Sequence, residues 1–565
     1  MGDSEVFQTV ADGSKQYVLQ DFKLEMPNLW SLETPNLYTA YSLVRQEGFR
    51  IDDFVSTFGI RAVTFDPVAG LSLNGKSLKL KGVCIHHDLG CLGAAAHDRA
   101  IERRLKALQS IGCNAIRLSH NPPAPHLLDL CDRMGFLVID EAFDKWFGNY
   151  SGGDFGSPGW SDWWQEDLRA VLARDHNHPS VILWSVGNEA GAVGSDAFNG
   201  TLKQLVDFVR LEEPSRPVTS AFAPPADSTG TLDDFANATA SSAAFVDVLA
   251  LNYQEQYLDL YRAKIPNQVM LSSESYPYFR AVTNGYDAIN DWWSVVTRDF
   301  DAGQFVWTGV DYLGETTGWP SKGWPNGLID TCSYVKAAAG FHQTVWRDVP
   351  TVKISVVSEK LNLDLGLPVW RSPQSARQWN FSGREGQALL VNTVSNCDTV
   401  ELILNGTSFG IQQPINFPNF TISWYVRYAP GKLEAIGRTG DKIVAQDLLR
   451  TAGPPAKINL HADRDKIAAD GLEVTHIEVT LVDSAGILVP DHDTRLVFAV
   501  SGPARLIGVD NGDLRSLESY QGNSRTTYQG KALAVIQSTG PPGLIIFAAL
   551  AEGLPTATTG VAAMA

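Results

Sequence analysis

Cysteine is scarce in this chain of 565 residues, which has six, at positions 84, 91, 113, 131, 332 and 397. None of them is spaced as Cys-x-x-Cys. Few cysteines without paired spacing exclude a disulfide scaffold and give no indication of a structural zinc site. We expect reduced, mostly buried thiols.

Positive charge is also in short supply, with 45 Lys and Arg against 63 Asp and Glu and a formal net charge of −18. No cluster of basic residues offsets this average. Such a chain repels phosphate backbones and anionic membrane surfaces, so a nucleic-acid partner is not expected.

Long apolar runs are absent: no stretch reaches the roughly 18 consecutive apolar residues that a membrane span requires. The first residues, MGDSEVFQTVADGSKQ, lack the basic and apolar segments of a secretory signal. We therefore expect no membrane partner, and a cytoplasmic location is favoured.

Hydrophobic residues make up 44% of the chain and aromatic residues 10%, which is enough for several large cores. The length predicts roughly three to five domains. Residues 1–75 read as short alternating strands, in the runs YTAYSLVRQ (38–46), DDFVSTFGIRAVTF (52–65) and LSLNGKSLKL (71–80), with an Asn74-Gly75 hairpin turn, which predicts part of an immunoglobulin-like β-sandwich. After about residue 355 the sequence again consists of strand-like runs separated by Gly, Pro and Asn turns. This pattern predicts two further immunoglobulin-like β-sandwiches, at 353–453 and 454–565, separated near Gly453-Pro454-Pro455.

Between them, residues 76–352 alternate strand-like and helix-like segments. Apolar residues at helical spacing predict helices at 98–112 and 123–135, each ending at a glycine. Eight such βα units in about 270 residues predict a central (β/α)8 TIM barrel flanked by the β-sandwiches. The eight predicted strands are LKGVCIHH, NAIRLSH, FLVIDEA, VILWSVGNE, PVTSA, DVLALNY, QVMLSSES and GQFVWTGVDY.

Polar residues collect at the carboxyl ends of these runs, the end at which barrel enzymes carry their active sites. Taken singly, each is first read as a strand cap or a solvated loop residue, but the set together favours a catalytic face. Its members are His86, His120, Asp140, Glu141, Asn188, Glu189, Asn252, Tyr253, Glu274 and Trp307.

Glu189 and Glu274 close the fourth and seventh runs, and two carboxylates held on rigid strands are the minimal machinery for cleaving a glycosidic bond. Glu189 suits a general acid, and Glu274 suits an ionised nucleophile that attacks the anomeric carbon. The sequence does not give the distance between the carboxyl groups, so retention and inversion both remain open at this point.

The runs GVCIHHD, CNAIRLSHNPP, LCDRMGFLVIDEAFDKW, HPSVILWSVGNEAG and Ser-Ser-Glu-Ser at 272–275 resemble glycoside hydrolase family 2, particularly its β-galactosidase branch. LNGTSFG and the stretch from GVDNGD to AVIQS are similar to domains appended in that branch. The resemblance implies a retaining mechanism through a covalent glycosyl-enzyme, with Glu189 as acid/base and Glu274 as nucleophile.

Further roles are implied by the same resemblance. It implies sugar-contacting histidines at His86 and His120, an arginine paired with the nucleophile at Arg117, and an asparagine at Asn188 that binds the sugar 2-hydroxyl. It also implies a tyrosine beside the nucleophile, Tyr253, and an aromatic wall of the sugar subsite, Trp307.

The sugar is indicated by residues 324–328, Trp-Pro-Asn-Gly-Leu. β-Glucuronidases of this family carry Asn-x-Lys here, whereas Asn326-Gly-Leu resembles the β-galactosidase sequence whose asparagine lies near the galactose 6-hydroxyl. We therefore expect an exo-acting enzyme that releases terminal β-galactose from an oligosaccharide or glycoside. Two alternatives stay open: the same mechanism on a β-glucuronide, β-mannoside or α-L-arabinoside, and a carbohydrate-binding module that has lost catalysis.

No metal or cofactor is expected. Large bacterial β-galactosidases of the family bind magnesium through a Glu-x-His, and Lys145-Trp146-Phe147 stands at the corresponding positions, where it offers no ligand. Eleven of the fifteen tryptophans lie between residues 140 and 350, which agrees with sugar stacking, although the pairs Trp163/Trp164 and Trp292/Trp293 are expected to pack barrel helices.

Family members begin with a jelly-roll domain and a complete first sandwich, and this chain is expected to start inside that sandwich. The jelly-roll normally supplies an acidic residue near the sugar 6-hydroxyl. Half a sandwich exposes a sheet edge and an apolar face, so we predict a homo-oligomer, most simply a dimer, that buries this surface.

Overall fold

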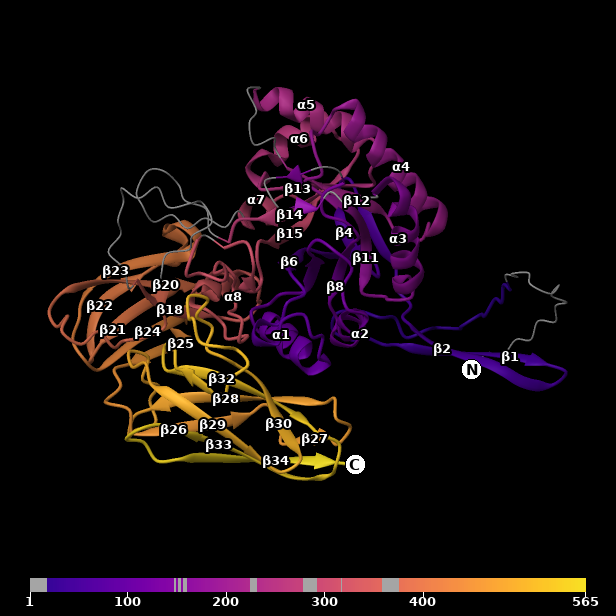
Figure 1. The fold of residues 1–565 in the computed structure, drawn as a ribbon. Helices are drawn as coiled ribbons and strands as arrows, with labels where there is room; N and C mark the ends of the chain where they lie inside the picture. The colour runs from indigo at the N-terminus through magenta and orange to yellow at the C-terminus, as the bar shows by residue number, and fades with distance from the viewer. Residues whose placement is uncertain are drawn as a thin grey trace.

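The computed structural model describes residues 18–146, 149–150, 154–155, 160–223, 231–277, 292–316, 318–357 and 375–565. Figure 1 shows a barrel surrounded by helices, two β-sandwiches beside and beneath it, and a two-stranded ribbon that projects from the N-terminal region. In the described part of the chain, no helix has the length and apolar character needed to cross a bilayer.

The barrel is a closed sheet of eight parallel strands in the order β11-β12-β13-β14-β15-β6-β7-β8. Each of the eight predicted runs carries one of these strands, so the prediction of a TIM barrel is confirmed. The strands are β6 (Leu80–Ile85), β7 (Ala115–Leu118), β8 (Leu137–Glu141), β11 (Val181–Asn188), β12 (Val218–Phe222), β13 (Val248–Asn252), β14 (Val269–Ser275) and β15 (Asp301–Val306).

Helices cover the outside of the barrel (Figure 1). The first two follow the predicted ranges closely, and the second ends at Gly135, whose φ of 74° is the left-handed conformation that favours glycine. The helices are α1 (Asp98–Ser110), α2 (Pro125–Met134), α3 (Trp160–Asp175), α4 (Asp196–Glu212), α5 (Leu232–Ala243), α6 (Leu258–Lys264), α7 (Trp292–Val296) and α8 (Gly340–Val345).

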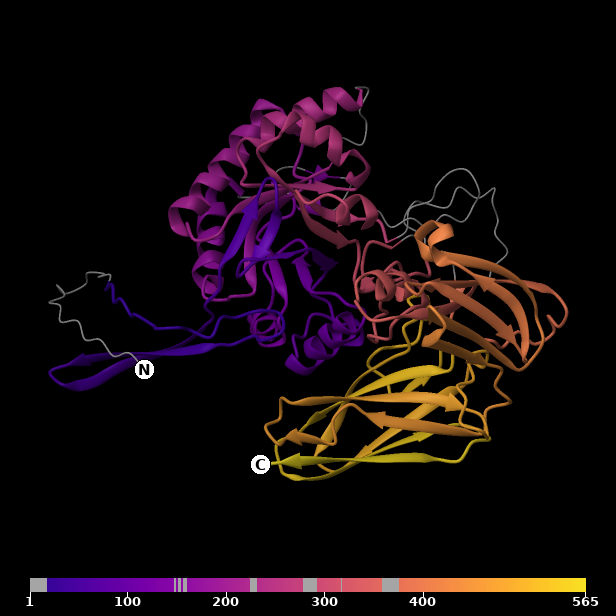
Figure 2. The same ribbon diagram turned by 180° about the vertical axis from the view of Figure 1, so that it is seen from behind.

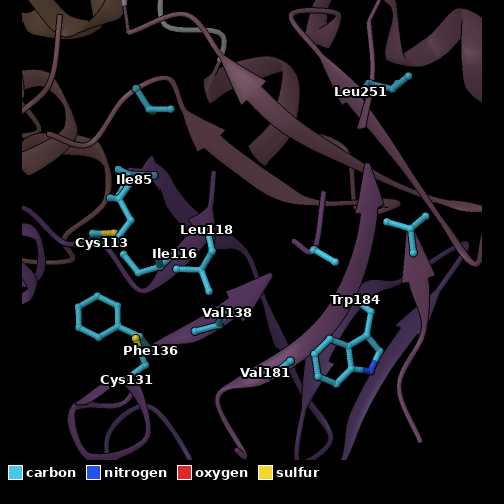
Figure 3. Packing of buried hydrophobic residues seen from close by; sticks show 14 of the residues in the cluster. Ile85, Cys113, Ile116, Leu118, Cys131, Phe136, Val138, Val181, Trp184 and Leu251 are labelled. Atoms are coloured by element: carbon cyan, nitrogen blue, oxygen red, sulfur yellow. The ribbon is translucent and has the colours of Figure 1, made fainter. Parts of the chain in front are cut away.

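The main hydrophobic core lies between the strands and these helices. Figure 3 shows part of it, where Ile116 and Val138 on neighbouring strands lie near Phe136, Cys113 and Cys131. All six cysteines are buried and free, as predicted from their number and spacing.

A small antiparallel sheet, β3 (Val63–Asp66), β4 (Gly70–Leu73) and β5 (Lys76–Leu78), closes the amino-terminal end of the barrel. Leu71 and Leu73 share one hydrophobic cluster with residues at the start of the barrel strands, among them Leu80 and Leu137. The Asn74-Gly75 turn joins β4 and β5 as expected, with φ of 52° and 77°. The domain boundary predicted between residues 75 and 76 passes through this hairpin, which packs as the floor of the barrel.

The remaining N-terminal strands are β1 (Tyr38–Gln46) and β2 (Phe49–Phe58), which, among the described strands, pair only with each other. Both views show this ribbon standing away from the barrel (Figures 1 and 2). The predicted run at 52–65 is divided at residues 59–62, because there the chain leaves the ribbon to dock on the barrel. Gly59 lies against Pro179, and the Arg61 guanidinium donates to the carbonyl oxygens of Pro179 and Val181 at 2.5 Å.

The first C-terminal sandwich consists of two four-stranded sheets, β19-β18-β20-β23 and β22-β21-β24-β25, around one core. Helix α8 packs against it through β18 and β20. Its strands are β18 (Val352–Val357), β19 (Ser375–Ala376), β20 (Ala388–Ser395), β21 (Thr399–Leu404), β22 (Thr407–Gln412), β23 (Thr421–Arg427), β24 (Lys432–Thr439) and β25 (Lys442–Arg450).

The second sandwich pairs the sheets β26-β28-β32-β30 and β27-β34-β33-β29-β31. It docks on α1 through ion pairs such as Arg99 with Asp463 at 2.9 Å and Arg103 with Glu478 at 2.8 Å. Its strands are β26 (Lys457–Ala462), β27 (Lys466–Ala468), β28 (Val474–Val482), β29 (Arg495–Ser501), β30 (Ala504–Asp510), β31 (Ser524–Thr526), β32 (Lys531–Ser538), β33 (Gly543–Leu550) and β34 (Ala557–Met564).

Two short hairpins complete the described strands. One joins β9 (Asn149–Tyr150) to β10 (Asp154–Phe155), and the other joins β16 (Tyr312–Leu313) to β17 (Gly323–Trp324). The second hairpin follows β15 directly, so it lies at the carboxyl end of the barrel.

Candidate active site

Glu274 lies near the carboxyl end of β14 and is 4% exposed. Arg117 Nη1 donates to its Oε1 at 2.6 Å, and the Tyr253 hydroxyl donates to its Oε2. Burial raises the pKa of Glu274 and the charge of Glu189 adds to this, while Arg117, His120 and the Tyr253 hydroxyl oppose it. The carboxylate is thus held rigidly, with donors on both oxygens.

Arg117, from β7, is fully buried and joins Glu274 to a second buried carboxylate, Glu141 on β8. Its Nε and Nη2 donate to Glu141 Oε2 at 3.1 and 2.8 Å. Glu141 also lies 2.6 Å from His120 Nδ1 and accepts from the Ser185 hydroxyl at 2.7 Å. Burial alone would raise the pKa of Glu141, but Arg117, His120 and Ser185 lower it to about 2. A charged pair with this many hydrogen bonds fixes the position of the arginine.

Glu189 directly follows β11 and its side chain is 31% exposed, far more than that of Glu274. Asn252 Nδ2 donates to its Oε1 at 2.9 Å, and the Lys145 ammonium lies 3.9 Å from its Oε2. Both Glu189 and Tyr253 have positive φ, 47° and 58°. Residues other than glycine in this conformation are strained and cluster at functional sites.

Asn188 connects the two glutamates. Its Oδ1 accepts from Arg117 Nη2 at 2.9 Å and from Asn252 Nδ2 at 3.0 Å, so its Nδ2 points the other way, toward Asp144 Oδ1 at 3.2 Å. Lys145 donates to the Asn188 carbonyl oxygen at 3.2 Å and pairs with Asp144 at 3.0 Å. The amide is therefore oriented by charged groups on both sides.

Aromatic rings form a wall beside this network. The rings of His120 and Trp307 stack with centroids 5.1 Å apart, and His86 lies edge-on to Trp307 at 5.3 Å. Burial, and next the neighbouring His120, lower the pKa of His86 to about 3. His86 Nε2 is buried and finds no hydrogen-bond partner among the described residues. An unpaired buried nitrogen at a site commonly marks the place of a ligand or water.

Among the described residues, Asn326 makes no hydrogen bond to this network, but its segment lies beside the loop that follows Trp307. It is 6% exposed, and the segment around it runs beside residues 308–311, where Leu328 N donates to Thr308 O at 3.3 Å. Its neighbour Gly327 donates to the buried Asp311 at 2.7 Å. The structure thus joins seven of the nine predicted site residues by direct contacts, links Glu189 to them through Asn252, and places Asn326 on an adjoining segment.

Some residues of the network were not assigned a role from the sequence. The sequence marks Glu141 and Asn252 only as polar strand ends, and it assigns nothing to Asp144 and Ser185. For Glu141, Ser185 and Asn252 the available signal is their place near strand ends, because polar residues there can face the barrel interior; Asp144 lies beyond the end of β8 and carries no such signal. Lys145 was considered only as a position that offers no magnesium ligand, whereas its ammonium contacts the site; Phe147 lies outside the described residues.

The prediction for the paired tryptophans is half right. Trp164 packs on Phe208 and Trp292 is 2% exposed, as expected for helix packing. The prediction is wrong for Trp163, whose side chain is 62% exposed. It is also wrong for Trp293, which contacts Phe420 of the neighbouring sandwich.

Among the described residues, one group of possible metal ligands stands close together, Asp129, Asp132 and His178. His178 precedes β11, so the group lies at the opposite end of the barrel from Glu189. The 2.6 Å contact between His178 and Asp132, with the Ser180 N–H on the same carboxylate at 3.0 Å, accounts for its arrangement.

The barrel mouth thus holds two carboxylates. One is buried and accepts hydrogen bonds on both oxygens, and the other is partly exposed to solvent. This pair defines the site of a hydrolase that acts on glycosidic bonds. Comparison with known families agrees. Residues 68–317 match the TIM barrel domain of glycosyl hydrolases family 2, residues 3–61 match glycosyl hydrolases family 2, and residues 458–560 match its C-terminal domain 5. Residues 386–445 match a domain of unknown function.

Individual proteins are similar over most of the chain. The beta-galactosidase BoGH2A of Bacteroides ovatus is 33% identical over 98% of this chain and 69% of its own length. A putative beta-glucuronidase of Formosa agariphila is 28% identical over 92% of this chain and 52% of its own length. The crystal structure of a family 2 member from Bacteroides cellulosilyticus superposes with a TM-score of 0.88 at 37% identity, covering 95% of this chain and 69% of that one. This chain belongs to glycoside hydrolase family 2.

Proposed function

We propose that the protein is a retaining, exo-acting β-galactosidase in which Glu274 is the nucleophile and Glu189 the acid/base. The contrast between the two carboxylates carries this assignment. Glu274 is buried, with both oxygens bound by Arg117 and Tyr253, whereas Glu189 is partly exposed, where a leaving group departs and water enters.

In the first step, Glu274 attacks the anomeric carbon while the bond from that carbon to the leaving-group oxygen breaks. Glu189 gives its proton to that oxygen, and a covalent glycosyl-enzyme forms. The Arg117 guanidinium keeps Glu274 ionised and pointed at the carbon, because any rotation would break the 2.6 Å contact.

In the second step, Glu189 takes a proton from water, the water oxygen bonds to the anomeric carbon, and the bond to Glu274 breaks. The Asn252 amide and the Lys145 ammonium hold Glu189 in place for both proton transfers. His86 Nε2, with no protein partner among the described residues, suits a contact to a sugar hydroxyl, and Trp307 suits the apolar face of the ring.

A neutral sugar is supported by the groups around Asn326. The nearby cation, Lys336, donates to both oxygens of Asp311 at 2.9 and 3.0 Å and to the Pro325 carbonyl at 2.6 Å. An ammonium has three N–H donors, so these contacts use all of them. Within the described ranges of the chain, a substrate carboxylate would therefore find no free cation beside Asn326. The name of BoGH2A, a beta-galactosidase, points the same way.

A second candidate is the same mechanism on a β-glucuronide, because similar proteins from Formosa agariphila and Bacteroides fragilis are named as beta-glucuronidases. A panel of 4-nitrophenyl β-galactoside, β-glucuronide, β-mannoside and α-L-arabinoside separates these possibilities. We expect the highest kcat/KM on the galactoside. A preference for the glucuronide would replace our sugar assignment.

The mechanism is tested with Glu189→Ala and Glu274→Ala on the preferred substrate. Azide should restore activity to both, giving the β-azide with Glu189→Ala and the α-azide with Glu274→Ala, and NMR of the wild-type product should show the β-anomer first. Initial release of the α-anomer refutes retention. A binding module without catalysis predicts no turnover, and equal sugar binding by the wild type and Glu274→Gln.

We also propose that the β1–β2 ribbon associates with a second copy of the chain, giving a dimer. Tyr41, Phe49 and Phe54 are 76%, 76% and 68% exposed, and such a ribbon is marginal alone. Light scattering is expected to give twice the chain mass. A monodisperse monomer contradicts the proposal.

A further inference from the structure

The β16–β17 hairpin carries a carboxylate, Glu315, that the mechanism above does not use. The hairpin begins five residues after Trp307, and its first strand is anchored on the loop that follows β6, where Leu313 N donates to Asp88 Oδ2 at 3.4 Å. The second sandwich supports its other arm, because Lys322 N donates to Leu514 O at 2.9 Å and its ammonium lies 4.0 Å from the Tyr520 ring. The hairpin is thus held at both ends beside the sugar site.

Tyr312 connects Glu315 to the aromatic wall. Its ring lies 4.3 Å from that of His86 and 5.9 Å from that of Trp307, and its hydroxyl donates to Glu315 Oε2. Burial and Glu315 raise the pKa of Tyr312, and Glu274 also contributes, so this hydroxyl keeps its proton and lies close enough to feel both carboxylates. The carboxylate of Glu315 is therefore held one tyrosine ring away from the wall.

Glu315 also has the backbone of a positioned residue. Its φ of 48° is nearly that of Glu189, and a glutamate gains nothing by itself from the left-handed conformation. The Tyr312 hydroxyl is the one donor that contacts its carboxylate in the described parts of the chain, and no cation pairs with it there. An ionised carboxylate has acceptor capacity for several donors, so most of this capacity is open to a ligand.

Among the described residues, the cations of the site bind other groups, and the Lys322 ammonium of the hairpin lies over the Tyr520 ring. Arg117 binds Glu141 and Glu274, and Lys336 binds Asp311. A ligand that reaches the rim therefore meets the uncompensated charge of Glu315. Hydroxyl groups donate to such a carboxylate, whereas a second carboxylate is repelled by it.

We infer that Glu315, presented by Tyr312 beside His86 and Trp307, determines specificity by binding hydroxyl groups of a neutral sugar and repelling a uronic acid. This inference rests on the proposed function, since it assigns to one residue the preference for a neutral sugar. It adds an acidic group at the rim that belongs to the barrel domain itself.

The test compares the wild type with Glu315→Gln, which keeps the shape and the acceptor for Tyr312 but removes the charge. Inhibition constants for D-galactonolactone and D-glucarolactone are measured against the best nitrophenyl substrate, together with binding of both lactones by calorimetry. We expect the wild type to favour galactonolactone. In the variant, the ratio of the two inhibition constants should narrow by at least about tenfold, because the negative charge that repels the glucarolactone carboxylate is removed. Tyr312→Phe should narrow the same ratio of inhibition constants by a smaller factor, since the Glu315 carboxylate loses the hydroxyl donor that positions it.

Glu552→Gln is the matched control, because Glu552 is exposed on the second sandwich, and its ratio should equal that of the wild type. A ratio that changes less than threefold in Glu315→Gln overturns the inference, as does a wild type that binds neither lactone. Failure of the proposed function is seen separately, as absence of β-galactoside turnover by the wild type, while calorimetry still reports the effect of Glu315.

Discussion

Replacing Arg117 by methionine removes the one guanidinium that contacts both buried carboxylates of the site. In the folded protein Arg117 is 1% exposed and donates to Glu274 at 2.6 Å, to Glu141 at 2.8 Å and to Asn188 at 2.9 Å. Methionine fills much of the same volume but donates to none of them. The variant thus tests whether the charge, rather than the bulk, of this side chain positions the nucleophile.

The size of the effect follows from the burial of the pair. Removing one partner of a buried salt bridge costs about 3–5 kcal/mol, because the other charge is left uncompensated. If this cost opposes ionisation and attack by Glu274, it adds to the activation free energy of the first step. At neutral pH, kcat/KM then drops by about two to nearly four orders of magnitude.

The assay is kcat/KM across pH on the nitrophenyl glycoside that the wild type hydrolyses fastest. Glu274 must be ionised to attack, so the rate falls as the pH drops through its pKa, which burial already raises. Without Arg117 the carboxylate holds its proton to higher pH. The acid limb of the profile should therefore move to higher pH in the variant.

Arg169→Met is the matched control, since Arg169 pairs with Glu166 and Glu212 on the protein surface and such pairs contribute little. Its profile should match the wild type. If Arg117→Met folds, as judged by circular dichroism, yet keeps kcat/KM within tenfold and an unmoved acid limb, the reasoning about Arg117 is refuted.

Three further outcomes are expected. Tyr253→Phe removes the hydroxyl donor on Glu274 and should lower kcat about 10- to 100-fold with a small change in KM, and an unchanged kcat would contradict this role. Lys145→Met removes the cation 3.9 Å from Glu189 Oε2 that helps to hold this carboxyl group, and should lower kcat about tenfold, while Lys203→Met on the exposed side of α4 should leave kcat unchanged. Burial lowers the pKa of His342 to about 3, and neither ring nitrogen has a partner among the described residues. The folded state keeps His342 neutral while the unfolded chain takes up the proton, so stability is lost as the pH falls below about 6.5, by about 2 kcal/mol at pH 5. His342→Leu should therefore flatten the fall in melting temperature between pH 7 and 5, and an equal fall in both proteins would show that His342 does not cause it.

The barrel could be predicted because each of its strands is a local, continuous apolar run. VILWSVGN and VMLSSES are buried along their whole lengths, as parallel strands covered by helices must be. Their carboxyl ends meet at one face of a closed barrel whatever the details of packing. For that reason Glu189 and Glu274 could be placed together before their contacts were known.

The network around the glutamates could not be predicted in the same way. Glu141 and Arg117 lie on neighbouring strands, and their contact depends on the register in which Arg117 stands beside Ile139. A slip of one residue would turn these side chains to the other face. The role of Glu141 as a second buried anion therefore appears only in the folded barrel.

In the N-terminal region, the local sequence pattern did not predict where a strand ends. Alternation predicted strands at 38–46 and 52–65, but not that Gly59 to Ala62 would leave the ribbon and dock on the barrel. That break depends on contacts with Pro179, more than a hundred residues away. Short-range periodicity carries no information about such a contact.

By itself, the sequence determined the eight-stranded barrel, the two sandwiches that follow it and the pair of glutamates, because these depend on apolar runs and on residues at strand ends. The tertiary structure alone decided how the charged groups are partnered: Glu141 with Arg117, Lys145 with Glu189, and Glu315 with the Tyr312 hydroxyl. The physical reason is that electrostatic contacts depend on distances of a few ångströms between side chains from separate strands and loops, and these distances are set only when the whole barrel closes.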